Sequence, residues 1–173
     1  MNTALKTQTR TPDILLTTLN SKYIHAAFGL RYLMANLGDL QSQAALMEFT
    51  IHDRPIDIVE KIIDSDAKIV GFSVYIWNVT ETNEVVQLLK AAQPDITVVL
   101  GGPEVSHVPD QPLVVSWADY VIKGPGERSF QQLCRQLLDD RPPAQPVIQG
   151  ENVPLEQLIM PYDWYSEEDL NNR

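Results

Sequence analysis

The sequence contains few groups that could crosslink it or hold a metal cluster. Cysteine occurs once, as Cys134, so no disulfide can form within the chain and no cysteine cluster exists for zinc or for iron and sulfur. Phe130, Leu133, Cys134 and Leu137 recur at a spacing that places them on one face of a helix. We therefore expect Cys134 to be a core residue.

Basic side chains are also scarce, since 13 Lys and Arg stand against 23 Asp and Glu and give a net charge of −10 at pH 7. Without a compensating Lys and Arg cluster, a nucleic-acid backbone or an anionic membrane has no electrostatic reason to bind. Long apolar runs are missing, and the polar residues 1–12 lack the hydrophobic segment of a signal peptide. We expect a soluble, cytoplasmic protein with a flexible leader over residues 1–12 and with neither nucleic acid nor membrane as a partner.

Short apolar segments alternate with amphipathic ones along most of the 173 residues, of which 44% are hydrophobic. The expected strands cover residues 14–19, 44–49, 69–74, 96–100 and 120–122. Because these strands are apolar throughout, both faces of the sheet should be buried, and the intervening helices should make right-handed crossovers. The pattern predicts one α/β domain over residues 13–141, with a doubly wound, flavodoxin-like (Rossmann-like) parallel sheet of five strands.

The character of the sequence changes at Pro142. Prolines are scattered through the rest of the chain, which has neither helical nor strand periodicity: they are Pro142, Pro143, Pro146, Pro154 and Pro161. We interpret residues 142–173 as an irregular linker arm, of the kind that leads to a following domain.

A ligand of such a sheet is expected at the carboxyl ends of the strands, near the point where the strand order reverses. The loops that begin there, at residues 20–25, 75–78, 101–107 and 124–128, concentrate glycine, amide, hydroxyl and aromatic groups, whereas the loops at 64–68 and 93–95 hold ordinary charged and turn residues. The candidate binding residues are Asn20, Ser21, Lys22, Tyr23, His25, Ser73, Tyr75, Trp77, Asn78, Gly101, Gly102, Pro103, Glu104, Val105, Gly124, Gly126 and Glu127.

The third strand and its loop offer a hydroxyl between aromatic walls. Ser73 stands beside Tyr75 and Trp77, a combination that suits a planar or heterocyclic group, although an aromatic side chain alone more often belongs to a core. Asn78 and Glu81 have the spacing of a capping box at the start of the next helix.

The remaining candidates each have two interpretations. Gly101 and Gly102 let backbone approach a bulky ligand or form a tight turn, and Glu127 could accept a hydrogen bond from a ligand or cap its own helix. His25 is a candidate metal ligand, but no second ligand follows at a helical spacing, so a hydrogen-bonding loop residue is the more usual role.

Three stretches together resemble a known family. Residues 101–106, Gly-Gly-Pro-Glu-Val-Ser, are similar to its Gly-Gly-Pro-His-Val-Ser run, with Glu104 in place of the common histidine. Residues 119–130 are similar to its Asp-hydrophobic strand, Gly-Glu-Gly-Glu turn and phenylalanine-containing helix, and residues 69–74 to its strand that ends in serine. Over approximately residues 13–140 the chain resembles the cobalamin (B12)-binding domain that precedes the catalytic core of many radical S-adenosylmethionine enzymes.

This resemblance implies where the cofactor binds. The corrin ring would lie over the carboxyl edge of the sheet and its nucleotide tail would enter a crevice of small residues, a role that Ser73, Gly101 and Gly102 match. Many cobalamin proteins supply a cobalt ligand from Asp-x-His-x-x-Gly, but here Tyr23 stands two residues before His25, and Gly29 four after it. The motif is broken, so His25, water or no ligand could lie below cobalt.

The resemblance also implies that this chain does not act alone. The family's catalytic half needs a Cys-x-x-x-Cys-x-x-Cys site, and a chain with one cysteine has none. An iron–sulfur cluster and S-adenosylmethionine would belong to a C-terminal radical S-adenosylmethionine domain of the same polypeptide. We expect a cobalamin-binding module whose full-length protein carries out methyl transfer or related radical chemistry.

Other uses of the same fold fit less well. A receiver domain needs acidic residues after the first strand and an aspartate after the third, where Asn20 and Ser73 stand. A flavodoxin proper needs a glycine-containing phosphate loop, and residues 17–21 supply hydroxyls without glycine. A docking module without any cofactor stays open, because a fold does not determine a function.

Overall fold

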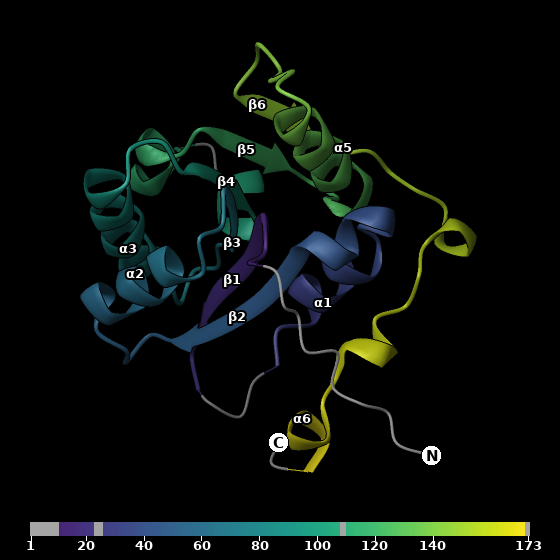
Figure 1. Ribbon diagram of the computed structural model, residues 1–173, viewed down its shortest axis with the longest axis horizontal. Coiled ribbons are helices and arrows are strands. Elements are labelled where there is room, and N and C mark those ends of the chain that lie inside the picture. Colours follow the sequence, from purple (N-terminus) through teal and green to yellow (C-terminus); the bar gives the residue numbers. More distant parts are fainter. Residues whose placement is uncertain (1–10, 23–25, 108–109, 172–173) are drawn as a thin grey trace.

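Six parallel strands form the centre of the computed structural model, which describes residues 11–22, 26–107 and 110–171 (Figure 1). The strands are β1 (Ile14–Asn20), β2 (Ala44–Thr50), β3 (Ile69–Ser73), β4 (Thr97–Gly101), β5 (Tyr120–Lys123) and β6 (Val147–Gln149). Their order across the sheet is β2-β1-β3-β4-β5-β6, and every neighbouring pair is parallel. Because β1 has β2 on one side and β3 on the other, the chain reverses its direction of travel across the sheet at β1.

Helices cover both faces of this sheet, with α1 and α5 on one side and α2 and α3 on the other (Figure 1). The helical elements are α1 (Phe28–Ala35), η1 (Gly38–Gln43), α2 (Pro55–Asp64), α3 (Val79–Ala92), α4 (Pro103–Ser106), η2 (Leu113–Trp117), α5 (Glu127–Leu138), η3 (Leu155–Gln157), η4 (Tyr162–Trp164) and α6 (Glu167–Asn171). The doubly wound α/β prediction is confirmed.

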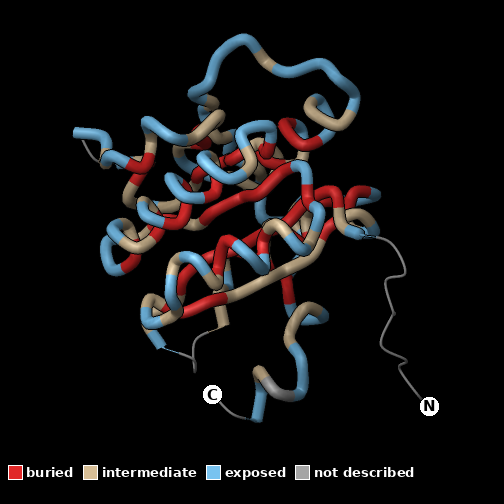
Figure 2. Tube along the Cα trace, turned by 60° about the vertical axis from the view of Figure 1, so that its left-hand side comes forward, coloured by how far each residue is buried: buried red, intermediate tan, exposed pale blue. Residues whose placement is uncertain are grey.

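Two hydrophobic clusters, one on each face, hold the layers together. In β1, Ile14 and Leu16 pack toward α1 and α5, while Leu15 and Leu19 pack toward α2 and α3. Burial on both faces explains why β1, β3 and β4 are apolar without alternation, and Figure 2 shows buried segments at the centre of the molecule. Cys134 is fully buried, as expected, in the cluster between the sheet and the helices α1 and α5, and burial raises the pKa of its thiol.

The sheet has one strand more than the sequence predicts, because β6 comes from the proline-rich segment. Val147 pairs with Val121, and the backbone N–H of Val121 donates to the carbonyl of Pro146 at 2.8 Å. Pro146 lacks an N–H, but it stands just ahead of a short edge strand, where proline is tolerated. Only three residues long and half exposed, β6 has no periodicity that could predict it.

The segment after β6 contacts the domain repeatedly along its length. Arg128 of α5 forms an ion pair with Glu151 at 3.2 Å, and the side-chain amide of Asn36 exchanges two hydrogen bonds with the backbone of Ile159, at 3.0 and 2.9 Å. Arg31 of α1 then donates to a main-chain carbonyl near the end of the segment. The described part of the linker after β6, residues 150–171, is called the arm from here on. It runs from α5 across α1 (Figure 1). In the part of the chain that the structure describes, no helix is both long and apolar enough to cross a membrane.

Candidate functional site

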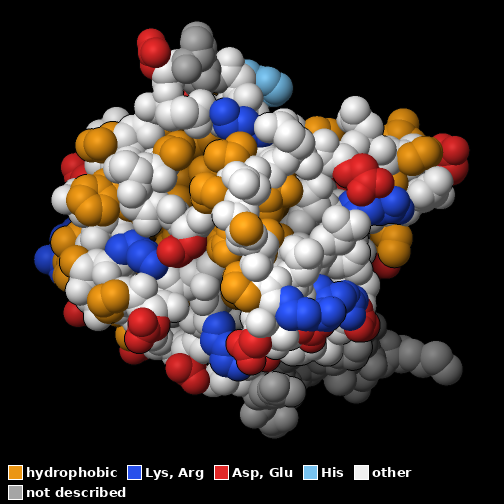
Figure 3. All heavy atoms as spheres, turned by 90° about the horizontal axis from the view of Figure 1, so that it is seen from above, with side chains coloured by type: hydrophobic (Ala, Val, Ile, Leu, Met, Phe, Trp, Pro, Cys, Tyr) orange, Lys and Arg blue, Asp and Glu red, His pale blue; other side chains and the backbone are white. Residues whose placement is uncertain are grey.

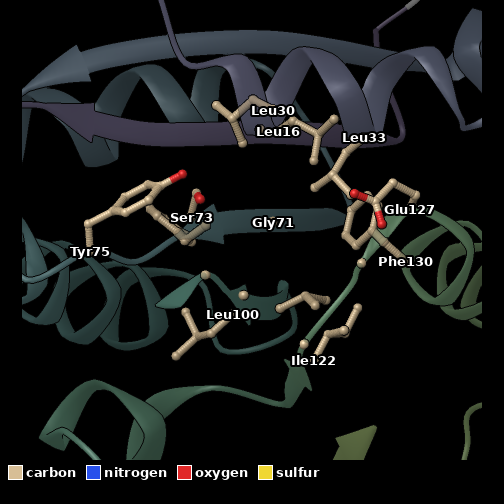
Figure 4. Close-up of a pocket in the computed structure, with 17 residues that line it drawn as sticks. Leu16, Leu30, Leu33, Gly71, Ser73, Tyr75, Leu100, Ile122, Glu127 and Phe130 are labelled. Carbon is tan, nitrogen blue, oxygen red and sulfur yellow. The ribbon is translucent and has the colours of Figure 1, made fainter. Parts of the chain in front are cut away.

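A cavity of about 160 Å³ lies between the carboxyl halves of the central strands and the helices α1 and α5 (Figure 4). Its walls are mostly apolar: Leu16, Leu30, Leu33, Phe72, Val99, Leu100, Ile122 and Phe130. Glycines complete the lining: Gly29, Gly71, Gly101, Gly102, Gly124 and Gly126. An apolar cavity of about 150 Å³ is enough to take up one benzene ring, so this one is suited to a small ring system.

Polar groups lie at the ends of the cavity. The hydroxyls of Ser73 and Tyr75 lie at one end, and the Glu127 carboxylate lies at the other, beside Phe130 (Figure 4). Among the residues that the structure describes, neither hydroxyl has a hydrogen-bond partner. A hydroxyl both donates and accepts, so this end can recognise a ring nitrogen or oxygen.

The two neighbouring glycines at the end of β4 have different roles. A Cβ atom on Gly101 would meet no atom within 4 Å, so the absent side chain is what keeps this side of the cavity open. Gly102 has a φ of +105°, and a Cβ atom there would lie 2.5 Å from the carbonyl oxygen of Val74. The ligand-approach interpretation thus fits Gly101, and the tight-turn interpretation fits Gly102.

The Asn78 side chain stabilises the turn after β3 by hydrogen bonds to backbone groups. Its Oδ1 accepts the backbone N–H of Tyr75 at 2.8 Å, and its Nδ2 donates to the carbonyls of Leu19, at 3.0 Å, and Ser73, at 3.2 Å. The side chain is fully buried and makes no capping hydrogen bond to α3, so the capping-box prediction with Glu81 is wrong. These bonds to the turn outcompete the cap and fix where Ser73 and Tyr75 stand.

Aromatic side chains extend the site beyond the cavity. The rings of Tyr75 and Trp77 stack with centroids 4.4 Å apart and planes 7° apart. Trp77 is 49% exposed and does not line the cavity itself. The stacked pair therefore presents a flat aromatic surface to solvent beside the cavity's polar end.

The other predicted binding residues are divided by the structure. Those that line the cavity are Ser73, Tyr75, Gly101, Gly102, Gly124, Gly126 and Glu127. Those that the structure describes away from its lining are Asn20, Ser21, Lys22, Trp77, Asn78, Pro103, Glu104 and Val105. Tyr23 and His25 lie outside the described residues. The assignment of all these residues to cofactor binding stays a prediction.

The cavity also contains residues that sequence reasoning did not single out. Gly71 lies in the middle of buried β3, and a Cβ atom there would lie 3.0 Å from the Phe130 ring. A glycine inside an apolar strand is a usable signal of close approach. The apolar walls gave no such signal, because Leu16 and Phe130 follow the same pattern as the core.

The described residues hold no cluster of metal-ligating side chains, and the face drawn in Figure 3 shows no separate basic patch. Within residues 11–22, 26–107 and 110–171 no three His, Cys, Asp or Glu side chains gather where they could hold a metal ion. On the face that Figure 3 shows, Lys and Arg side chains lie beside Asp and Glu side chains rather than in a separate basic patch. The cavity itself offers apolar walls, the hydroxyls of Ser73 and Tyr75, and the Glu127 carboxylate.

Comparison with known proteins identifies the family of this chain. Residues 14–134 match the B12 binding domain family. The chain is 34% identical over 82 residues to the 2-(S-pantetheinyl)-carbapenam-3-carboxylate methyltransferase of Streptantibioticus cattleyicolor, covering 45% of this chain and 12% of that protein. It is 32% identical over 90 residues to the cobalamin-dependent radical SAM methyltransferase TokK of Streptomyces tokunonensis, covering 50% of this chain and 12% of that protein.

A solved structure shares the fold. A cobalamin-binding protein from Desulfitobacterium hafniense superposes with a TM-score of 0.50 and 24% sequence identity, over 72% of this chain and 58% of that one. The matched family covers the strands and helices that build the cavity, from β1 to α5. The chain therefore belongs to the B12-binding domain family and is a cobalamin-binding domain.

Proposed function

We propose that this chain is the cobalamin module of a radical S-adenosylmethionine enzyme and that the reaction it serves is methyl transfer. The support is the similarity of the chain to two methyltransferases, one of which is a cobalamin-dependent radical SAM enzyme. Because the matched region is only 12% of each of those proteins, their chemistry resides largely in parts that this match does not cover.

The cavity beside Gly101 is the observation on which the placement of cobalamin rests. A corrin macrocycle is far larger than about 160 Å³, so it would lie outside, over the carboxyl edge of the sheet. The benzimidazole of the nucleotide tail is a small fused ring that would suit the apolar walls, and its one unsubstituted nitrogen could accept a hydrogen bond from the Ser73 or Tyr75 hydroxyl. The side chain that Gly101 lacks would occupy this space.

The chain's own residues would bind, orient and shield the cofactor. Leu16, Leu30 and Phe130 exclude water from the tail, and the stacked Tyr75 and Trp77 rings offer a surface against which the corrin can pack. When bound, cobalamin supplies a cobalt centre that can carry a methyl group. His25 is our candidate for its lower ligand, with water or no ligand as the alternatives.

The radical half of the reaction needs other residues. Cys134 is fully buried and is the single cysteine, so it cannot hold an iron–sulfur cluster. We assign that cluster and S-adenosylmethionine to a C-terminal radical S-adenosylmethionine domain of the same polypeptide, in the cytoplasm. Residues 13–141, with β6 added at the edge of their sheet, would be the module proper, and the arm would lead toward that domain.

The test is a visible-absorption titration of the purified chain with hydroxocobalamin, followed by desalting. Corrin bands that stay with the protein are expected, and their positions report whether an imidazole or water lies on cobalt. A parallel titration with cobinamide, which lacks the nucleotide tail, should show weaker binding because the cavity then stays empty. Equal binding of cobinamide would contradict the placement of the tail, and loss of both ligands would favour a cofactor-free docking module.

A further inference from the structure

One carboxylate holds both ends of the connection between β1 and α1. Oε2 of Glu48, on β2, accepts a hydrogen bond from the side-chain amide of Asn20 at 2.7 Å and from the backbone N–H of Ala27 at 2.8 Å. Asn20 is the last residue of β1, and Ala27 is the residue before α1. Glu48 therefore fixes where α1 begins relative to the carboxyl edge of the sheet.

A buried guanidinium joins this carboxylate to the arm. Arg31 is only 5% exposed, and its Nη1 donates to Oε1 of Glu48 at 2.5 Å. Its Nη2 donates to Oδ2 of Asp169, on α6, at 3.1 Å, and its Nε donates to the carbonyl of Trp164 at 3.2 Å. A buried charge that loses a partner is strongly destabilised, so Arg31 favours the arrangement in which both carboxylates are in place.

The arm contributes more than one contact to this junction. The Tyr165 ring lies over the guanidinium, with its centroid 4.9 Å from Cζ of Arg31. Partial burial acts to raise the pKa of Asp169, but hydrogen bonds from Ser166 and the charge of Arg31 together act more strongly, so the pKa lies below its ordinary value. Asp169 is therefore a carboxylate at neutral pH, as the ion pair requires.

The helix that carries Arg31 is also a wall of the cavity. Gly29, Leu30 and Leu33 of α1 line the cavity, and Arg31 lies between them in the sequence. Any change in how the first turn of α1 sits on the sheet moves both the junction and the cavity wall. The arm and the cavity thus share one rigid element.

We propose that the Glu48–Arg31–Asp169 junction couples docking of the arm to cobalamin binding, with Glu48 and Arg31 as positioning residues for the cavity. This inference rests on the proposed placement of the cofactor in the cavity. Coupling between two sites is reciprocal: a docked arm raises the affinity for cobalamin, and bound cobalamin holds the arm in place by the same factor. The position of the arm would then depend on whether cobalamin is bound.

The first test uses Asp169→Asn, which keeps the shape of the side chain and removes its charge. Arg31 keeps Glu48, so the fold is retained, while the arm loses its ion pair. Hydrogen exchange followed by mass spectrometry should show faster exchange in residues 161–171. The dissociation constant for hydroxocobalamin, from the absorption titration, should rise about five- to tenfold, at the low end of typical coupling.

The second test approaches the junction from the other side with Glu48→Gln. Among the described residues, the hydrogen-bond and ion-pair partners of Glu48 are Asn20, Ala27 and Arg31, and none of them belongs to the arm. Exchange in residues 161–171 should nevertheless become faster, and cobalamin should no longer slow it as it does in the wild type. A purely local structural role of Glu48 would leave the arm unaffected.

The control is Glu151→Gln, which removes the arm's more exposed ion pair, with Arg128, away from Glu48. Its affinity for hydroxocobalamin should match that of the wild type. Wild-type affinity in Asp169→Asn, or unchanged arm exchange in Glu48→Gln, would overturn the coupling and leave the proposed function intact. Failure of the wild type to bind cobalamin would overturn both.

Discussion

The two edges of the sheet differ in what their polar groups do. At the carboxyl edge, the Ser73 and Tyr75 hydroxyls face a cavity, and no partner is found for them among the described residues. At the amino edge, the ammonium of Lys90 donates to Asp119 at 3.0 Å and to the carbonyls of Pro94 and Ile96, each at 2.9 Å. These groups at the amino edge are paired within the fold, whereas the two cavity hydroxyls at the carboxyl edge are not paired with any described residue.

The amino edge is closed at several points in the same way. Asp119 also accepts the backbone N–H of Val98 at 2.7 Å, and Lys68 forms an ion pair with Asp13 at 2.8 Å. Groups that are already paired within the fold gain little from a ligand, whereas the partly buried hydroxyls of Ser73 and Tyr75 can each form a new hydrogen bond with one. The location of unpaired hydroxyls and absent side chains, more than the number of polar residues, marks the binding edge.

The largest effect on this contrast is expected from Gly101→Trp. The indole would fill the space that the missing side chain leaves, and φ at Gly101 is not positive, so the backbone tolerates the change. Affinity for hydroxocobalamin should fall on the order of 100-fold, or about 2.7 kcal/mol. Asp95→Trp places the same side chain on the exposed amino edge and should bind as the wild type does. Equal affinities of the two variants would place the site elsewhere.

The next largest effect concerns stability, from Asp119→Ala. The variant leaves the N–H of Val98 without its side-chain acceptor and removes the carboxylate paired with Lys90, whose ammonium keeps the carbonyls of Pro94 and Ile96. The free energy of unfolding, measured in urea, should fall by about 1–3 kcal/mol, while the folded variant keeps its cobalamin affinity. Asp119→Asn, which retains an acceptor oxygen, should lose less. A selective loss of affinity would show that Asp119, part of the family-like stretch, acts on the ligand instead.

The fold could be predicted because its signals are local. Apolar strands such as Ile14–Asn20 and amphipathic helices such as Glu127–Leu138 carry their periodicity within one segment. β6 could not be predicted, because three half-exposed residues behind a proline resemble a loop, and only pairing with β5 makes them a strand. The contacts of the arm were hidden for a related reason, since Arg31 and Asp169 stand 138 residues apart.

The site was predictable where a residue type is unusual for its position. Ser73 and Gly101 stand out at the ends of apolar strands, and both line the cavity. Leu30 and Phe130 do not stand out, because a residue that lines an apolar cavity and one that fills a core follow the same pattern. Asn78 was misread in its capping role because the sequence does not reveal that its amide is held by the turn after β3.

Ser73→Ala tests whether an unpaired hydroxyl is reserved for the ligand. Because the hydroxyl has no partner among the described residues, its loss should leave the free energy of unfolding unchanged within about 0.5 kcal/mol. Cobalamin affinity should fall about three- to tenfold, the value of one hydrogen bond. The matched variant at the amino edge is Ser65→Ala. In the wild type the Ser65 hydroxyl donates to the carbonyl of Ile62 at 2.6 Å. It should lose stability and keep its affinity, and the same effect in both variants would remove the distinction between the edges.

The smallest effect is expected at the turn between α2 and β3. Asp66 has a φ of 57°, a left-handed conformation that costs a non-glycine residue about 1 kcal/mol or more. Asp66→Gly should raise the free energy of unfolding by up to about 1 kcal/mol, reduced by the greater freedom of glycine in the unfolded chain. Asp66→Ala removes the same charge without relieving the strain, so a gain shared by both variants would point to reduced repulsion in a chain of net charge −10. A gain confined to glycine, with unchanged cobalamin affinity, would show that the amino edge can be altered without reaching the site.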